Sequence, residues 1–142
     1  MPEPHLFVDI SAHGFGHLAQ VAPVLDALTG QLPGLRISIR SGLSKARLQA
    51  RITTPFGYLP GSSDFGYVMH DAMRVDLAAT AQAYRAQHAD WHGRVDRETR
   101  FLDELQADLV LTDVAYLPLA GAAHAGIPAV AMCSLNWAEL FA

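Results

Sequence analysis

The sequence predicts an α/β domain of the Rossmann-like type, in which helices cover both faces of a mainly parallel sheet to give three layers. Apolar runs typical of strands alternate with helical segments along all 142 residues. Three of these runs, at 5–10, 108–112 and 129–133, are apolar on both faces, which is typical of strands in a parallel sheet. At this length we expect a single domain over 1–142.

The first half of the chain is expected to form strand, loop, helix and a second strand. The run 5–10 is the first strand, and turn-rich residues follow it. A helix covers 17–28, because apolar residues recur there at spacings of three and four, and Thr29 and Gly30 end it. The next expected elements are a strand at 35–39, a short helix at 44–50 and a short strand near 56–59.

The second half begins with one long expected helix over 76–106, in which Asp76 is the N-cap and Gly93 marks the place for a break. Tyr84 and Trp91 belong to its apolar stripe, so we expect both rings to face the sheet. The remaining expected elements are a strand at 108–112, a helix at 118–125 with Gly126 as its C-cap and a strand at 127–133.

Composition limits the classes of partner. Charged residues make up 17% of the chain, against about 25% in an average domain. We therefore expect an unusually apolar exterior, which contacts a further domain or forms a homodimer. The net charge of −4 and a pI near 5.9 exclude nucleic acid as a partner.

Cysteine usage and the apolar segments indicate a cytoplasmic protein. Cys133 is the single cysteine, so no internal disulfide or thiolate metal cluster can form, and the first residues lack the basic region of a signal peptide. The uncharged stretch 114–138 is long enough to cross a bilayer. Prolines, glycines and polar residues interrupt it, so we expect a buried helix and strand there and no transmembrane segment.

The loop after the first strand carries the spacing of a dinucleotide-binding turn. Gly14, Phe15 and Gly16 open the pattern G-x-G-x-x-G/A, whose backbone N–H groups can approach a pyrophosphate, a phosphate or a sugar hydroxyl. The acidic residue typical of NAD sites is missing after the second strand. Arg40 and Ser41 stand there instead, which leaves an NADP-binding domain open, as well as glycines that serve only the turn.

Two histidines flank the loop backbone, although a simple pyrophosphate site needs none. His17 falls in the first turn of the expected helix, where a histidine can act as a general base if a carboxylate fixes its tautomer. Asp113, at the carboxyl end of the strand 108–112, is the candidate carboxylate. The alternatives are that Asp113 caps the next helix and that the His17 imidazole has no catalytic role. His13, Ser134 and Asn136 lie in segments expected at the same edge of the sheet.

Three segments of the chain resemble a known family. HGFGHL, DFGYVMHDAMRVDLAAT and ADLVLTDVAYLPLAGAAHAGIPAVA resemble the amino-terminal glycosyltransferase-like domain of plant L-arabinokinases and their bacterial relatives, over nearly the whole chain. More distantly, GHL and LVLTD resemble the acceptor-side, N-terminal half of GT-B glycosyltransferases, the superfamily of UDP-glycosyltransferases and MurG. The resemblance implies a C-terminal nucleotide-sugar-binding domain that is absent from this chain.

The resemblance also implies an activity and its residues. His17 would be the base that deprotonates a sugar or other hydroxyl acceptor, Asp113 would orient it, and a UDP-sugar would be the donor, with no metal and no tightly bound cofactor. Gln20 departs from the pattern, since relatives carry proline or arginine at that position. Asp64 and Asp71 fit the family pattern, and their carboxylates could hydrogen-bond sugar hydroxyls.

The leading hypothesis is therefore the N-terminal domain of a glycosyltransferase of the hexosyltransferase type, inactive as an isolated fragment. The alternatives are a non-catalytic regulatory module that binds a sugar or nucleotide, and an NADP-binding Rossmann domain.

Overall fold

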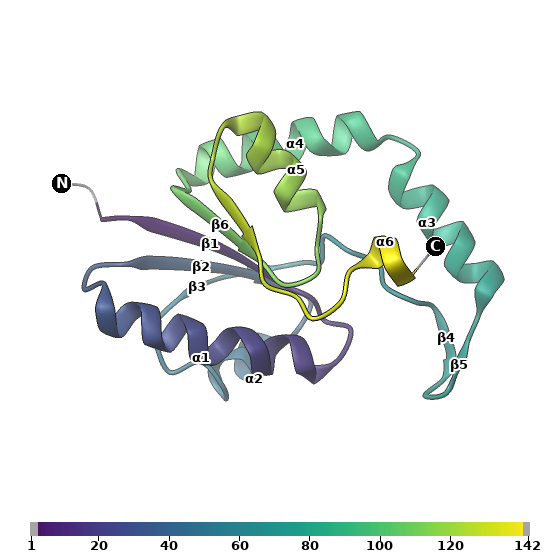
Figure 1. Ribbon diagram of the computed structural model, residues 1–142, viewed down its shortest axis with the longest axis horizontal. Coiled ribbons are helices and arrows are strands. Elements are labelled where there is room, and N and C mark those ends of the chain that lie inside the picture. The colour runs from purple at the N-terminus through teal and green to yellow at the C-terminus, as the bar shows by residue number, and fades with distance from the viewer. Residues whose placement is uncertain (1–2, 141–142) are drawn as a thin grey trace.

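The computed structural model describes residues 3–140 and contains a five-stranded parallel sheet (Figure 1). Its strands are β1 (His5–Ile10), β2 (Arg36–Ser41), β3 (Gly57–Pro60), β6 (Leu109–Thr112) and β7 (Ala129–Ala131), in the order β3-β2-β1-β6-β7. The chain builds the sheet outward from β1 on one side and then on the other, so the strand order reverses between β1 and β6. Ligands of open α/β sheets bind beyond the carboxyl ends of the strands at such a point.

Helices cover both faces of the sheet, which confirms the predicted α/β fold. On one face lie α1 (Phe15–Gln31) and α2 (Lys45–Gln49), and on the other α4 (Trp91–Leu105) and α5 (Leu117–Ala125) (Figure 1). The hairpin of β4 (Met69–Asp71) and β5 (Arg74–Val75) and the helix α3 (Leu77–His88) form an arm beside this body. The last helix, α6 (Trp137–Leu140), lies between the arm and the sheet.

The period-two alternation of β1 divides the core between the two faces of the sheet. Leu6, Val8 and Ile10 lie in the apolar cluster that includes the buried side of α1. Phe7 points to the other face and packs with Leu102 of α4. All six residues of β1 are buried, as expected for the central strand of a parallel sheet.

Asp9 places a buried carboxylate in the central strand β1, and a buried cation compensates its charge. The guanidinium of Arg40, on β2, lies 2.7 Å from the Asp9 carboxylate and also binds both carboxylate oxygens of Glu98 on α4. The rings of Phe7 and Phe101 each lie 5.1 Å from the guanidinium carbon. Burial raises the pKa of Asp9 to about 6, although the Arg40 charge acts in the opposite direction. All three guanidinium nitrogens of Arg40 are therefore engaged within the protein. Arg40 is thus not available to bind the ribose phosphate of NADP, as the NADP-binding alternative requires.

The long helix predicted over 76–106 is in fact two helices, because α3 ends at His88 and α4 begins at Trp91. Asp76 caps α3 as predicted and accepts a hydrogen bond from a first-turn N–H at 2.9 Å. Because of the break, α3 belongs to the arm while α4 packs on the sheet. The apolar stripe predicted over 76–106 therefore does not form one surface that faces the sheet. Tyr84 is 44% exposed, and its predicted place in the core is wrong, whereas Trp91 is half-buried.

β7 is an exposed strand, although its apolar sequence predicted a buried one. All three of its residues are exposed, and Val130 is 50% exposed. Within residues 3–140, β7 pairs with β6 alone and forms one edge of the sheet. An apolar strand is buried only when other elements cover both of its faces and a strand pairs with it on each side. The composition of the strand itself does not show whether these neighbours are present.

The uncharged stretch 114–138 contains the predicted helix, α5, and the predicted strand, β7, although the strand is exposed and not buried as expected. Gly126 ends α5 with a left-handed backbone at φ 71°, the C-cap that the sequence predicts. Among residues 3–140, no helix combines the length and the apolar character that crossing a membrane would require.

The buried Arg40 cluster generates a prediction about stability. Arg40→Met removes the cation from two buried carboxylates, so we expect the free energy of unfolding to fall by about 3–5 kcal/mol at pH 7. The loss should shrink toward pH 5, since protonated Asp9 no longer needs the cation. Urea unfolding at both pH values measures it, with exposed Arg100→Met as the control, expected within about 0.5 kcal/mol of the parent. A loss below about 1 kcal/mol for Arg40→Met would contradict the account.

Candidate functional site

The carboxyl ends of β1 and β6 bring the residues after these two strands together. Asp113 follows β6 and is fully buried, and its Oδ1 accepts a hydrogen bond from the backbone N–H of Ser11, after β1, at 3.2 Å. The backbone N–H of Val114 donates to the same oxygen at 2.6 Å. Tyr116, rather than Asp113, occupies the N-cap position of α5. The Asp113 carboxylate is therefore fixed by backbone donors and does not cap that helix.

His17 completes the pair that the sequence analysis expected. It lies in the first turn of α1, and its Nδ1 is 2.7 Å from Oδ2 of Asp113. An ionised carboxylate can only accept, so the ring donates its Nδ1 hydrogen and its Nε2 is free to take a proton. The hydrogen bond to Asp113 raises the pKa of His17, although partial burial acts in the opposite direction. The imidazole is 17% exposed, so solvent can reach it.

A second carboxylate lies beside the first and shares a partner with it. The hydroxyl of Ser11 donates to Oδ2 of Asp64 at 2.8 Å, while Ser62 donates to Oδ1 at 3.0 Å. Nε2 of His13 lies 3.9 Å from Oδ1 of Asp64. Ser11 thus links the two carboxylates, through its backbone to Asp113 and through its hydroxyl to Asp64. Asp64 is buried, and both of its oxygens are already engaged.

Gly66 explains how the loop after Asp64 can lie against His13. A Cβ at position 66 would lie 2.5 Å from Nδ1 of the His13 ring, and the backbone of Gly66 has φ 61°. Only glycine permits this approach without moving the ring. His13 also contacts Trp137 edge to face, with ring centroids 6.2 Å apart.

The glycine loop forms the N-terminus of α1. Gly14 is the N-cap with φ 115°, and no side chain there bonds the first-turn N–H groups. Phe15 is 66% exposed, and the guanidinium carbon of Arg47 lies 5.3 Å from its ring. Gly16 has open space where a Cβ would stand. The loop therefore leaves backbone donors accessible close to His17.

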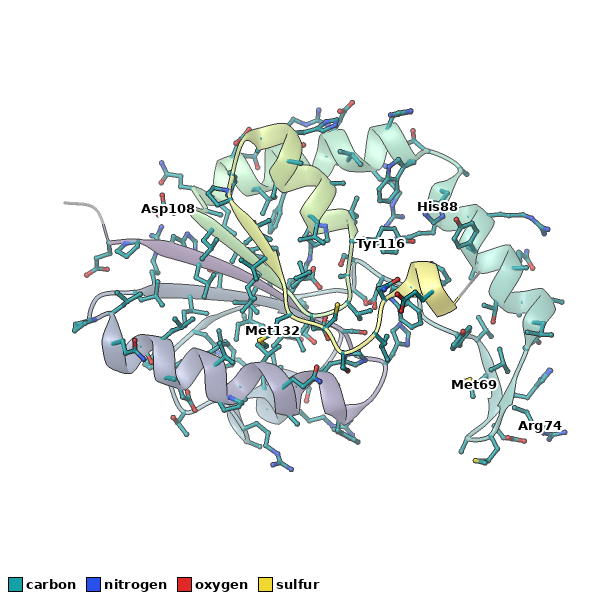
Figure 2. The ribbon with its side chains drawn as sticks, viewed as in Figure 1. Met69, Arg74, His88, Asp108, Tyr116 and Met132 are labelled. Atoms are coloured by element: carbon teal, nitrogen blue, oxygen red, sulfur yellow. The ribbon has the colours of Figure 1, made fainter. Side chains whose placement is uncertain are left out.

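A cavity of about 1030 Å³ lies between the arm and the sheet, and Asp113 forms part of its wall. Tyr116 and His88 lie side by side in it, with Oη and Nε2 3.1 Å apart (Figure 2). Further lining residues are Leu77, Arg85, Leu119, Cys133, Asn136 and Trp137. Asp113 and Asn136 were predicted at this edge from their places after strands. Arg85 and His88 were not predicted, because the apolar stripe of their helix indicated a place in the core.

The other predicted site residues lie at different distances from the His17 pair. Asn136 lines the cavity, and its Oδ1 accepts a hydrogen bond from the backbone N–H of Glu139 at 2.9 Å. Ser134 accepts one at 3.2 Å from Gln20, the residue that departs from the family pattern. Asp71 is not brought to the site, because it lies on the exposed hairpin and binds Arg74 there at 2.6 Å.

Comparisons with known proteins support the family resemblance. No family model matches the chain. L-arabinokinase of Arabidopsis thaliana is 27% identical over 135 residues, which are 94% of this chain and 13% of that protein. The chain therefore spans a small part of this relative.

Solved structures identify the fold. The glycotransferase of kitacinnamycin is 22% identical with a TM-score of 0.62, and the match covers 94% of this chain and 31% of that one. UGT2 of Phytolacca americana, complexed with UDP-2fluoro-glucose and pterostilbene, is 15% identical with a TM-score of 0.56, covering 91% and 30%. The chain is thus a distant homologue of a segment of L-arabinokinase, and it has the fold of one half of the GT-B glycosyltransferases.

Proposed function

We propose that this chain is the acceptor-binding part of a glycosyltransferase, with His17 as the general base and Asp113 as its orienting carboxylate. The observation that carries the proposal is the 2.7 Å contact between Nδ1 of His17 and the fully buried Asp113, which is also one of the residues that line the cavity of about 1030 Å³. A solvent-accessible imidazole with a fixed tautomer, next to a largely apolar cavity, has what base catalysis on a hydroxyl requires.

In the proposed reaction, the acceptor occupies the cavity that Asp113 lines, and one of its hydroxyls reaches Nε2 of His17, which is not itself among the lining residues. As the hydroxyl oxygen attacks the anomeric carbon of the donor sugar, Nε2 takes its proton. The new C–O bond forms while the bond between the sugar and the diphosphate breaks, and UDP leaves with that electron pair. Asp113 remains ionised throughout and stabilises the imidazolium that forms.

The donor would be held mainly by a part of the protein outside this chain, since the chain covers about 30% of the two glycosyltransferases compared. Within the chain, the accessible backbone donors of Gly14 and Gly16 lie next to His17 and are suited to sugar or phosphate oxygens. In this proposal Asp64 positions His13 through Ser11 and Gly66, because its own oxygens are already engaged by Ser11 and Ser62.

The first test concerns turnover by the protein that contains this chain and the donor-binding part. The probes are UDP-glucose and a panel of hydroxylated acceptors beginning with pterostilbene, and UDP release is measured. His17→Ala should lower kcat by roughly 10²–10⁴-fold, the usual contribution of a general base. Asp113→Asn should give a smaller loss, because an amide fills the same space without stabilising the imidazolium. Thr29→Ala, on the same helix and away from the pair, serves as the control.

The double variant separates a coupled pair from two independent residues. If Asp113 acts through His17, His17→Ala with Asp113→Asn should lose little more than His17→Ala alone. If the loss of kcat in the double variant equals the product of the two single losses, the two residues act independently, and Asp113 does not orient His17. Acceptor binding without any turnover in the parent protein would favour the non-catalytic sugar-binding module instead.

The pH profile provides a further prediction. The base must be neutral, and contact with Asp113 raises the pKa of His17 above its ordinary 6.5, so kcat/KM should rise with pH on a limb centred above 6.5. Asp113→Asn removes the largest cause of that shift and should move the limb to lower pH while its plateau falls. A limb that stays in place in Asp113→Asn would show that another group titrates.

A further inference from the structure

The cavity of about 1030 Å³ contains a hydroxyl–imidazole pair that the proposed proton transfer does not use. Tyr116 lies directly before α5, and His88 is the last residue of α3. Oη of Tyr116 is 3.1 Å from Nε2 of His88, and the two rings are nearly parallel, with 11° between their planes (Figure 2). The surrounding lining includes the apolar side chains of Leu77, Val114 and Leu119. The pair thus places an oriented polar group in a mainly apolar wall, where α3 of the arm meets the segment after β6.

The backbone of α3 determines the direction of the hydrogen bond in this pair. Nδ1 of His88 lies 2.8 Å from the carbonyl oxygen of Tyr84, one turn earlier in the helix. A carbonyl can only accept, so Nδ1 carries the hydrogen, and Nε2 of the neutral ring accepts from the Tyr116 hydroxyl. Burial raises the pKa of Tyr116 to about 12, so this hydroxyl keeps its proton at neutral pH. The Tyr116 oxygen has therefore committed its hydrogen to His88, and its remaining capacity is to accept a hydrogen bond.

Several other polar groups of the lining do not offer the same property. The Thr80 hydroxyl accepts from the backbone N–H of Val68 at 3.0 Å and donates to the carbonyl of that residue. The Asp113 carboxylate is engaged by backbone donors and by His17. Asn136 uses its side-chain oxygen to accept from a backbone N–H at 2.9 Å, which leaves its amide hydrogens as donors. Tyr116 is thus an acceptor in a wall where these carboxylate and amide oxygens are already occupied.

We propose that Tyr116, positioned by His88, determines specificity by accepting a hydrogen bond from a second hydroxyl of the molecule that is glycosylated. This inference rests on the proposed function, because it concerns the same cavity. The substrates it selects carry at least two hydroxyls on an apolar body, one for His17 and one for Tyr116. An ether at the second position would place two acceptors against each other, and a hydrogen or methyl group would leave the Tyr116 oxygen covered without a partner.

The test compares three small ligands of similar size, namely phenol, which can donate, anisole, which can only accept, and toluene, which does neither. NMR titrations of the full chain at pH 8, where an imidazole is ordinarily neutral, follow the methyl signals of Leu77 and Leu119 in the cavity. The parent should prefer phenol to anisole, and Tyr116→Phe should lower the ratio of the two affinities about three- to tenfold, as expected for one lost hydrogen bond. Tyr58→Phe removes a hydroxyl that lies outside the cavity and donates to the Leu43 carbonyl. It should leave the ratio within about twofold.

His88→Phe distinguishes a role in specificity from a bond that only fastens the arm. This variant keeps a ring beside Tyr116 but removes the nitrogen that accepts from its hydroxyl. The hydroxyl can then donate to a ligand, so the affinity for anisole should rise relative to toluene by at least about threefold. A purely structural bond would instead change the affinities for all three ligands by the same factor, and that result would overturn the proposal.

His17→Ala shows which group the phenol hydroxyl meets. The preference for phenol should persist in this variant, since Tyr116 is unchanged. A preference that survives Tyr116→Phe, or that disappears in His17→Ala alone, would place the hydroxyl at another group and overturn the proposal. A parent chain without any preference for phenol would do the same. These titrations contain no sugar donor, so they are independent of the turnover measurements, and a failure to release UDP would count against glycosyl transfer and not against these ratios.

Discussion

The parallel pairing of β1 with β6 brings together groups that lie about a hundred residues apart, and the site depends on it. Its register sets Asp9 opposite Thr112, so that Ser11 and Asp113 follow the two strands at the same edge. The N–H of Ser11 then reaches the Asp113 carboxylate, while its hydroxyl reaches Asp64. A shift of one residue in this register would point the side chains after β6 to the opposite face and separate the pair.

Each buried charge near the sheet is matched by partners on other elements. Asp9 and Glu98 share Arg40, Asp113 is held by backbone donors and by His17, and Asp64 by two serines. Such networks are costly to break, so they hold their members in one arrangement. The imidazole of His17 is thereby presented in one tautomer.

The sequence predicted those parts of the fold that depend on interactions between residues close together in the chain. The strand at 5–10, the cap of Asp76 on α3 and the C-cap at Gly126 follow from hydrophobicity, capping and backbone freedom. Long-range packing determines the remainder. The arm, the exposure of β7 and the capture of Arg40 by Glu98, 58 residues later, depend on contacts that no local window contains. His17 and Asp113 are predictable because both follow strands whose carboxyl ends meet at one edge of the sheet. His88 is not, because the apolar spacing of its helix indicates a place in the core.

The central claim, that Asp113 fixes and polarises His17, can be measured directly by an NMR titration of the His17 imidazole. In the parent chain its pKa should lie above 6.5, and the ring should be the Nδ1–H tautomer when neutral. In Asp113→Asn the pKa should fall, because the hydrogen bond to a carboxylate is its largest cause. A His17 pKa that is ordinary in the parent chain and unchanged in Asp113→Asn would contradict the account.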